Sequence, residues 1–345
     1  MKKKPLVSIM IPNYNHSKYL DECINSALNQ TYENVEIVIV DNSSEDNSLQ
    51  VAAKYAANNI RVCRNTYNVL NTSYNVLDQL TTGKYKMMLC ADDFIEPDFL
   101  ESAVAIMEKY PNVGYVHGER DFITDSGNLI KLEPFYNCSF LAPGWDTMPV
   151  YMVTTVAHPS QGIFREEVFR KCRGYDMEID HMNADRMLWY YLSYESDYAY
   201  IRKKMSNIRV GNQTETFITQ TNFQHPILCH LTLIEMVRFA KDYGLEAVYK
   251  REQEAYERLA KDFLNYAIGV LAADDRVCAG RYLDYIKILS KDITKQEIYQ
   301  RLLSMQQGKD MIEMEYLKAM TINALQKPRN YEPPHNYRKI DLEVL

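Results

Sequence analysis

Short apolar runs alternate with helix-like segments along the first third of the chain, and this alternation constrains the fold more than any other feature. The runs are residues 6–11, 35–40, 60–63, 85–90 and 113–116. Between them, apolar residues recur at the spacing of a helix, as Leu20, Ile24 and Leu28 do. Alternation of this kind predicts an α/β fold with a mostly parallel sheet and helices on both of its faces.

The pattern changes near residue 215. From residue 217 onward the strand signals stop, and apolar stripes at helical spacing follow one another. Acidic residues outnumber basic ones before this point and balance them after it. We therefore expect an α/β domain over residues 1–215, an all-helical region over 216–327 and an irregular, proline-containing tail over 328–345.

Charge and cysteine content exclude some classes of protein. The formal net charge is −7, so the chain lacks the basic excess of a nucleic-acid binder, and we expect no nucleic-acid partner. The seven cysteines are scattered, without the paired spacing of a zinc site or a disulfide framework. This favours a reducing compartment and a cytoplasmic protein. No stretch approaches the length of a transmembrane segment, although peripheral association with a membrane is left open.

Chemistry is expected directly after each strand, because ligands of parallel sheets bind beyond the carboxyl ends of the strands. The first run is followed by Pro12-Asn13-Tyr14-Asn15. This segment has no glycine, which excludes the glycine-rich turn of a dinucleotide-binding fold, and no GxxxxGK phosphate loop occurs elsewhere. The ring of Tyr14 stands instead where it could stack under a base.

An aspartate follows the second strand, and two interpretations of it stay open. Asp41 is followed by Asn42, Ser43 and Ser44. The segment could be a cluster of helix N-caps, since asparagine and serine are favoured there. Alternatively, the Asp41 carboxylate accepts a hydrogen bond from the ring N–H of a nucleobase.

Two adjacent aspartates, Asp92 and Asp93, follow the fourth strand and give the strongest local signal. Like charges held this close repel each other unless a cation lies between them. Mn²⁺ and Mg²⁺ prefer such oxygen ligands and keep positions open for phosphate oxygens. The pair predicts a divalent-metal site; the alternative is that both residues precede a helix and favour its dipole. His117, His158 and His181 have no partner at metal-ligand spacing, so we expect them to be structural.

The sequence around these strand ends resembles the family 2 glycosyltransferases, which have the GT-A fold. The matching segments are VSIMIPNYNHSKYLDECINSALNQTYENVEIVIVDNSSED, GKYKMMLCADD and IFREEVFRKCRGYD, within the first 215 residues or so. In such a family Tyr14 would stack on the base and Asp41 would bind it. Asp92 and Asp93 match the DXD-type element that binds the ribose and a divalent metal on the diphosphate. The remaining nucleotide-site residues that we expect are Pro12, Asn15 and Asn75.

The same resemblance implies residues on the acceptor side. Gly174-Tyr175-Asp176 resembles the acceptor-side turn, and Asp185 matches the aspartate that acts as general base. Asp185 could instead be a structural acid in the first turn of a helix. Arg165 and Trp145 are further candidates for donor or acceptor contacts. A surface ion pair is the alternative for Arg165, and a loop anchor is the alternative for Trp145.

Four positions depart from the family pattern. Ala184 stands where a glutamate is usual, and Gly211 stands where many members carry a histidine. These changes would remove an acceptor contact and a metal or phosphate ligand. Leu70 replaces a common glycine, and Tyr74 stands where an arginine precedes Asn75. The diphosphate side would then be held differently.

The resemblance implies an inverting glycosyltransferase of the hexosyltransferase type, with Mn²⁺ or Mg²⁺ as cofactor. The donor would be a nucleoside-diphosphate sugar, and UDP would be the default nucleotide of that donor. The acceptor would be a hydroxyl group in a polysaccharide, or in a lipid-linked or protein-linked glycan. The C-terminal helices would dock such an acceptor, pair with a second copy of the chain or form a helical cap.

Two other functions stay open. One is a non-catalytic nucleotide-sugar-binding or scaffold protein, which Ala184 and Gly211 favour. The other is a nucleotidyltransferase, and the missing glycine-rich loop argues against it.

Overall fold

The structure is a computed structural model, and it describes residues 4–55, 58, 60–69, 73–172, 184–211, 214–311, 313, 315–317, 319–320 and 330–342. Its contacts divide the chain into two compact units. Unit 1 comprises Met1–Met148, Thr155–Val210 and Asn330–Leu345, and unit 2 comprises Pro149–Thr154 and Gly211–Arg329. The chain therefore leaves unit 1, forms most of unit 2 and returns to unit 1. The boundaries expected from the sequence stay predictions.

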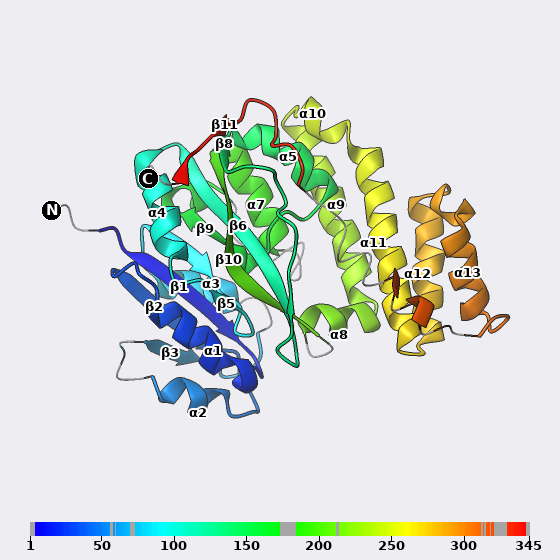
Figure 1. The fold of residues 1–345 in the computed structure, drawn as a ribbon, viewed down its shortest axis with the longest axis horizontal. Coiled ribbons are helices and arrows are strands. Elements are labelled where there is room, and N and C mark those ends of the chain that lie inside the picture. The colour runs from blue at the N-terminus through cyan, green and yellow to red at the C-terminus, as the bar shows by residue number, and fades with distance from the viewer. Residues whose placement is uncertain are drawn as a thin grey trace. The chain divides into compact units, whose positions relative to one another are not determined.

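Unit 1 is built on one mixed sheet, which has eleven strands among the described residues. The strands are β1 (Val7–Asn13), β2 (Val35–Asp41), β3 (Arg61–Arg64), β4 (Tyr85–Met88), β5 (Phe94–Ile95), β6 (Val113–Thr124), β7 (Leu129–Ile130), β8 (Phe140–Ala142), β9 (Gly162–Arg165), β10 (Asp197–Val210) and β11 (Arg338–Lys339). The main path through the sheet is β11-β8-β10-β6-β9-β4-β1-β2-β3, with β5 beside β10 and β7 beside β6. Most of these strands are labelled in Figure 1.

The half of the sheet from β4 to β3 is parallel, as the sequence predicted. β1 pairs in parallel with β2 and β4, and β2 pairs in parallel with β3. Val7 lies opposite both Val35 and Tyr85. The apolar runs of β1, β2 and β4 fit strands that are buried on both faces of a parallel sheet, whereas β3 at the edge is partly exposed. The expected strands of this half are confirmed at nearly their expected bounds.

The other half of the sheet is mixed, because β9 enters it in the opposite direction. β9 lies between β4 and β6 and runs antiparallel to both, whereas β10 is parallel to β6. A short 3-10 turn, η3 (Pro159–Gln161), precedes β9. As a result, the residues just before β9 lie beside those just after β4.

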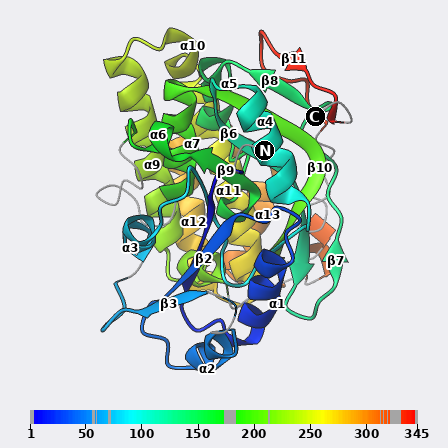
Figure 2. The same cartoon turned by 90° about the vertical axis from the view of Figure 1, so that its left-hand side faces the viewer.

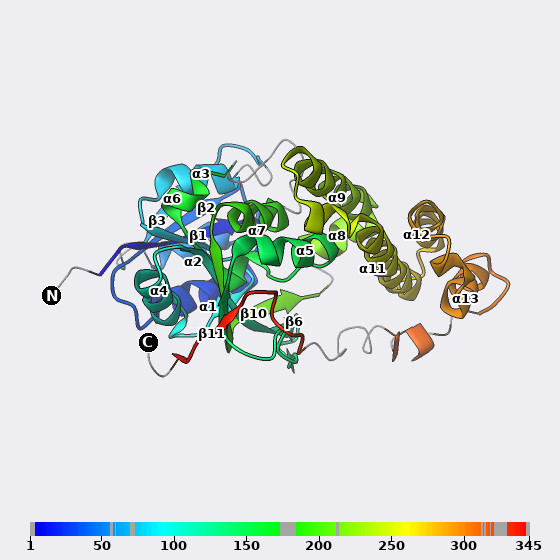
Figure 3. The same cartoon turned by 90° about the horizontal axis from the view of Figure 1, so that it is seen from above.

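Helices cover both faces of the sheet in unit 1, which confirms the predicted layering. The helices up to residue 195 are α1 (Ser17–Leu28), α2 (Ser48–Ala53), α3 (Ser73–Leu80), α4 (Phe99–Lys109), α5 (Gly144–Val153), α6 (Glu166–Phe169) and α7 (Ala184–Glu195). α1 and α4 lie on one face of the sheet, and α3, α6 and α7 lie on the other (Figures 2 and 3).

A buried core fixes α1 on the sheet and with it the loop between β1 and α1. Leu20 and Ile24 of α1 are almost fully buried, as is Ile9 of β1. Burying one such side chain stabilises the folded state by about 1.5–3 kcal/mol. The loop that this packing anchors at both ends carries Tyr14 and Asn15.

Unit 2 is helical, as the change of pattern after residue 217 predicted. Its helices are α8 (Glu215–Thr221), α9 (Gln224–Asp242), α10 (Glu246–Tyr249), α11 (Glu252–Ala272), α12 (Arg276–Leu289) and α13 (Glu297–Gln306), with a 3-10 turn, η4 (Ile293–Lys295). Phe263 of α11 packs against Tyr282 and Tyr285 of α12. In the part of the chain that the structure describes, no helix combines the length and apolarity needed to cross a membrane.

Candidate active site

Polar side chains gather where the parallel strands of unit 1 end. β1 ends at Asn13, β2 ends at Asp41, and β4 is followed closely by Asp92 and Asp93. Because β1 pairs in parallel with both β2 and β4, these strand ends share one edge of the sheet. The sequence predicted a ligand site at this edge.

Asp41 is buried in a hydrogen-bonded cluster between the ends of β1 and β2. Its Oδ2 accepts a hydrogen bond from Nδ2 of Asn13 at 2.8 Å, and its Oδ1 accepts one from the N–H of Ser44 at 3.0 Å. Nε of Arg64 lies 3.7 Å from Oδ1. These donors stabilise the carboxylate in its buried position, and each oxygen keeps lone-pair capacity for a further donor. Asp41 thus shapes the loop after β2 and still offers an acceptor.

The loop after β1 is tied to the loop after β2. Asn15 has a left-handed backbone conformation with φ 56°, which asparagine adopts more readily than most residues. Its N–H donates to Oγ of Ser44 at 3.0 Å, and its Oδ1 accepts from the N–H of Glu45 at 2.8 Å. Pro12 lies within β1, and the adjoining Tyr14 is 41% exposed. An exposed aromatic ring therefore stands beside the Asp41 cluster.

Asp92 and Asp93 lie in the turn after β4 and differ in exposure. Asp93 is fully buried, whereas Asp92 is partly exposed. Oδ1 of Asp93 accepts a hydrogen bond from the N–H of Arg209 at 2.8 Å, and Oδ2 accepts one from the hydroxyl of Ser160 at 2.6 Å. Burial and the adjacent charge of Asp92 raise the pKa of Asp93 well above its usual value. Two donors from distant segments therefore orient the buried carboxylate.

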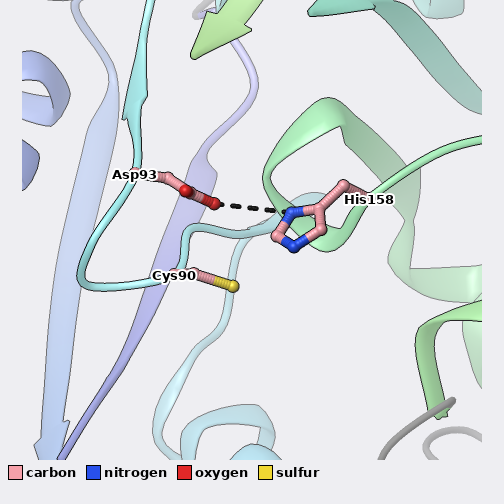
Figure 4. Close-up of side chains that lie close together, drawn as sticks. All are labelled: Cys90, Asp93 and His158. Atoms are coloured by element: carbon pink, nitrogen blue, oxygen red, sulfur yellow. Dashed lines mark ion pairs between the residues drawn. The ribbon is translucent and has the colours of Figure 1, made fainter. Parts of the chain in front are cut away.

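The turn η3 brings His158 and Ser160 to Asp93. Because β9 runs antiparallel to β4, the N–H of Cys90 reaches Oγ of Ser160 at 2.9 Å. Nδ1 of His158 lies 3.4 Å from Oδ2 of Asp93, and the thiol of Cys90 lies in the same cluster (Figure 4). Burial and the guanidinium of Arg120 lower the pKa of His158, so its ring is neutral at neutral pH. Sequence reasoning missed His158 as a site residue, because its partners are far away in the sequence.

Arg209, near the end of β10, holds the aspartate turn from the other side. Its Nε donates to the carbonyl oxygen of Asp92 at 2.9 Å, and its Nη1 donates to that of Thr124 at 3.1 Å. Its Nη2 pairs with the carboxylate of Glu22 at 2.8 Å, and the guanidinium carbon lies 3.9 Å from the centroid of the Tyr19 ring. Sequence reasoning did not assign Arg209 to the site. An arginine next to apolar residues in a strand was the available signal of a buried charge.

Asp185 and Asn75 are contributed by two helices of unit 1. Asp185 lies in the first turn of α7 and is partly buried. Burial and the charges of Asp93 and Asp92 raise the pKa of the Cys90 thiol, and the charge of Asp185 adds to this shift. Asp185 is therefore within electrostatic range of the aspartate turn. Asn75 is partly buried in α3, which packs against β1 and β2.

Arg165 is not part of this edge, which corrects the expectation that it contacts the donor. It lies in β9 opposite Tyr85, at the amino end of β4, whereas the aspartates follow the carboxyl end of that strand. Its guanidinium is buried and donates to the carbonyl oxygens of Val113 at 3.2 Å and Met107 at 2.8 Å. The arginine therefore satisfies backbone acceptors inside the domain.

Trp145 also lies away from the aspartates. It stands in the first turn of α5, directly after β8, which pairs with the amino end of β10. Its side chain is 64% exposed, so it does not anchor a loop. The acceptor-side turn that includes Gly174, together with Leu70 and His181, lies outside the described residues, and so does the side chain of Ala184.

The donor set at this edge fits a divalent cation. Asp92 and Asp93 offer carboxylate oxygens, and His158 offers a neutral imidazole nitrogen close to Asp93. These are ligand types that divalent cations accept in proteins. A cation here would offset the repulsion between the adjacent carboxylates.

Comparison with known sequences finds relatives of the first half of the chain. Residues 8–173 match the family described as "Glycosyl transferase family 2". A chondroitin synthase of Escherichia coli is 36% identical over 133 residues, which are 38% of this chain and 19% of that protein. A hyaluronan synthase of Pasteurella multocida is 34% identical over 128 residues, which are 36% of this chain and 13% of that protein. The chain thus spans only a small part of the length of these relatives.

Solved structures resemble the chain over most of its length. TarS of S. aureus, residues 1–349 in complex with UDP, has a TM-score of 0.55 at 15% identity, covering 92% of this chain and 91% of that one. The mannosyltransferase PcManGT of Pyrobaculum calidifontis, in complex with GDP-Man and Mn²⁺, has a TM-score of 0.52 at 15% identity, covering 94% and 88%. At such low identity this likeness shows a shared fold.

Proposed function

We propose that the chain, which belongs to glycosyltransferase family 2 through residues 8–173, transfers a sugar from a nucleoside-diphosphate sugar to a hydroxyl group of a glycan. The chain has the GT-A fold, followed by a helical region. One observation carries the proposal: Tyr14, Asp41 and the Asp92–Asp93 turn share one edge of the parallel strands. An exposed ring, a fixed acceptor and a pair of carboxylates suit a ligand that has a base at one end and a diphosphate at the other.

The base of the donor would lie between Tyr14 and Asp41. Stacking of a base on an aromatic ring contributes about 1–3 kcal/mol. The Asp41 carboxylate would accept a ring N–H, such as the one that uracil offers, so UDP is our default. Structures of similar fold were solved with UDP and with GDP-Man. Asn15 and Asn75 would border the rest of the nucleotide.

Asp92 and Asp93 would hold a divalent cation, Mn²⁺ or Mg²⁺, beside the diphosphate. When bound there, such an ion would act as a Lewis acid that stabilises the negative charge developing on the leaving diphosphate. The chain supplies the orientation. Ser160 and Arg209 hold the Asp93 carboxylate by hydrogen bonds, while Asp92 keeps part of its surface exposed.

Asp185 would act as the general base. The acceptor hydroxyl oxygen attacks the anomeric carbon, its proton passes to the Asp185 carboxylate, and the nucleoside diphosphate leaves from the opposite face, which inverts the configuration. A positioned base contributes about 10²–10⁴-fold to such a step.

A glycan acceptor is supported by the relatives. Two of them are named chondroitin synthase and hyaluronan synthase, and both names denote polysaccharide products. We therefore propose a hydroxyl group of a growing polysaccharide or glycoconjugate as the acceptor.

Thermal unfolding with and without nucleotides tests the donor site. UDP, GDP and dTDP would each be added with and without Mn²⁺. A ligand at 100 times its Kd stabilises the folded state by about 2.7 kcal/mol, which raises the Tm of a protein of this size by roughly a degree or more. We expect one nucleotide to raise the Tm in the presence of Mn²⁺, and Asp92→Asn to abolish the shift. Asp98→Asn, a control on a nearby aspartate, should keep it. No shift with any nucleotide, with or without Mn²⁺, would overturn the proposal.

Nucleotide-sugar binding without transfer is the second candidate, and the alanine at position 184 favours it. A donor with purified glycan acceptors separates the two candidates. Release of nucleoside diphosphate that depends on Asp185 supports transfer, and tight donor binding without release supports a binding role.

A further inference from the structure

Cys90, Asp93 and His158 bring a thiol, a carboxylate and an imidazole together at the aspartate turn (Figure 4). One ligand atom from each residue lies within 4.8 Å of the other two. Nδ1 of His158 and Oδ2 of Asp93 are 3.4 Å apart. Two ligands of the same tetrahedral ion, each bound at about 2.0–2.1 Å, have a comparable separation.

The backbone fixes this cluster without any ion. The N–H of Asp93 donates to the carbonyl oxygen of Cys90 at 3.0 Å, which closes the turn that carries both residues. Ser160, two residues after His158, accepts from the N–H of Cys90 and donates to Asp93. The pairing of β9 with β4 therefore sets the distance between the turn and His158.

Hydrogen bonds around Asp93 resemble the outer support of a metal site. Both of its oxygens accept a hydrogen bond, one from Ser160 and one from the N–H of Arg209. Metal-ligating carboxylates are commonly oriented in this way, because the hydrogen bonds leave a lone pair for the ion. Nδ1 of His158 also accepts from the N–H of Ser160, but over a long 3.4 Å, so an ion could replace this weak contact.

The chemistry of the three ligands selects among ions. Mg²⁺ demands oxygen ligands in near-ideal octahedral geometry. Thiolate and imidazole instead suit Zn²⁺ and related borderline ions. Three protein ligands drawn from cysteine, histidine and aspartate, with a fourth position open, are typical of a catalytic zinc site.

We propose that Cys90, Asp93 and His158 form a three-ligand cation site that takes Zn²⁺ or Co²⁺ in preference to Mg²⁺. Because Asp93 belongs to both sites, this ion would take the place of the Mn²⁺ or Mg²⁺ ion of the proposed function. On binding, the metal–sulfur bond forms as the Cys90 S–H bond breaks, and the proton leaves to solvent. The fourth position is then open to water or to an oxygen of a bound ligand. That this oxygen belongs to the donor diphosphate rests on the proposed function, whereas the three-ligand site does not.

Cobalt absorption tests the site directly. The full chain would be stripped of metal with a chelator and titrated with Co²⁺. We expect one equivalent to produce a near-ultraviolet sulfur-to-cobalt charge-transfer band, which Zn²⁺ removes and excess Mg²⁺ does not. Cys90→Ser should lose the band, and His158→Gln should weaken Co²⁺ binding by about tenfold or more.

A second substitution and a control keep the test decisive. Cys90→Asp, which replaces sulfur with oxygen, should lose the band and bind Mn²⁺ more tightly than the natural chain does. Cys138→Ser, which changes a partly buried thiol away from the cluster, should keep the band. Circular dichroism would confirm that each variant is folded. Absence of the band in the natural chain, or its persistence in Cys90→Ser, would overturn the inference.

The outcome separates this inference from the proposed function. Nucleotide-dependent shifts of the Tm with Mn²⁺, together with no cobalt band, would refute the three-ligand site and leave the donor site intact. A cobalt band that depends on Cys90, together with no response to any nucleotide, would establish the ion site and count against sugar transfer.

Discussion

The N–H of Arg209 donates a hydrogen bond of 2.8 Å to Oδ1 of Asp93, although the two residues are 116 positions apart in the sequence. The guanidinium of the same arginine donates to the carbonyl oxygen of Asp92. The last long strand of the sheet therefore fixes both aspartates of the turn after β4. Changing the Arg209 side chain should therefore shift the two aspartates, although Arg209 is not itself proposed to contact the ligand.

The substitution Arg209→Lys should weaken nucleotide binding and stability together. Lysine keeps the charge and the backbone hydrogen bond but cannot fork between the carbonyl oxygens of Asp92 and Thr124. Lysine can keep one of these two hydrogen bonds. Losing the other, which a charged group donates, costs about 1.5–3 kcal/mol, so we expect the free energy of unfolding to fall by roughly this amount. The Kd for the nucleotide should rise about tenfold, equivalent to about 1.4 kcal/mol. Calorimetric titration and denaturant unfolding measure the two effects.

Arg202→Lys, at an exposed position on the same strand, is the matched control for Arg209→Lys. Equal losses of stability and nucleotide affinity in both variants would count against a positioning role of Arg209.

The substitution Asp185→Asn should abolish most of the transfer while leaving donor binding intact. The amide keeps the shape of the side chain but cannot accept the acceptor proton, so kcat should fall by about 10²–10⁴-fold. The KM for the donor should change little. Release of nucleoside diphosphate with acceptor present measures both constants. Glu101→Gln, at another first-turn acid in α4, serves as control. An unchanged kcat in a folded Asp185→Asn protein would remove Asp185 from the mechanism.

The ring of Tyr14 should contribute to nucleotide affinity through stacking. Tyr14→Phe keeps the ring and should bind the nucleotide almost as tightly as the natural chain. Tyr14→Ala should lose about 1–3 kcal/mol of binding free energy, which raises the Kd roughly 5–150-fold. Titration with the nucleotide that gives a thermal shift measures this change. Tyr67→Ala removes a ring that is 69% exposed and should have no effect. Equal affinity of the alanine and phenylalanine variants at position 14 would exclude stacking.

Glu36 should make the stability of the chain depend on acid pH. Burial alone would raise the pKa of Glu36, but hydrogen bonds from Ser8 and Thr82, with the charge of Arg61, outweigh it and hold the pKa below its usual value of 4.5. The ionised form therefore stabilises the folded state at pH values above about 4.5, and this contribution disappears as the pH falls through the lowered pKa. Glu36→Gln should be less stable than the natural chain near neutral pH, and the difference should shrink in acid. Denaturant unfolding at several pH values measures it, and a difference independent of pH would refute the assignment.

The parallel half of the sheet could be predicted from the sequence, because strands buried on both faces leave continuous apolar runs. Asp41, Asp92 and Asp93 could be proposed as site residues for the same reason, since each follows such a run directly. The layering of helices on both faces followed from the alternation of strands and helices. In these respects local pattern and tertiary structure agree.

The rest of the candidate site depends on pairings that no local pattern encodes. His158 and Ser160 reach Asp93 only because β9 runs antiparallel to β4. Arg209 reaches the turn only because β10 pairs with β5 and extends past it. Arg165 was assigned to the wrong edge for a related reason: its strand direction, which places it at the amino end of β4, cannot be read from the residues around it.

The two-residue strand β11 has a consequence for how the helical unit can be removed. Arg338 and Lys339 pair with Leu141 and Phe140 of β8, so the segment after unit 2 completes an edge of the sheet. A stop codon after Val210 would delete this strand along with the helices. β8 would still pair with β10, but its outer edge would be unpaired, and an unpaired edge promotes aggregation. The helices of unit 2 are therefore inserted between two parts of unit 1. An internal deletion would instead keep β11. In such a variant, a flexible linker would join residue 210 to residue 330, so that β11 could still pair with β8.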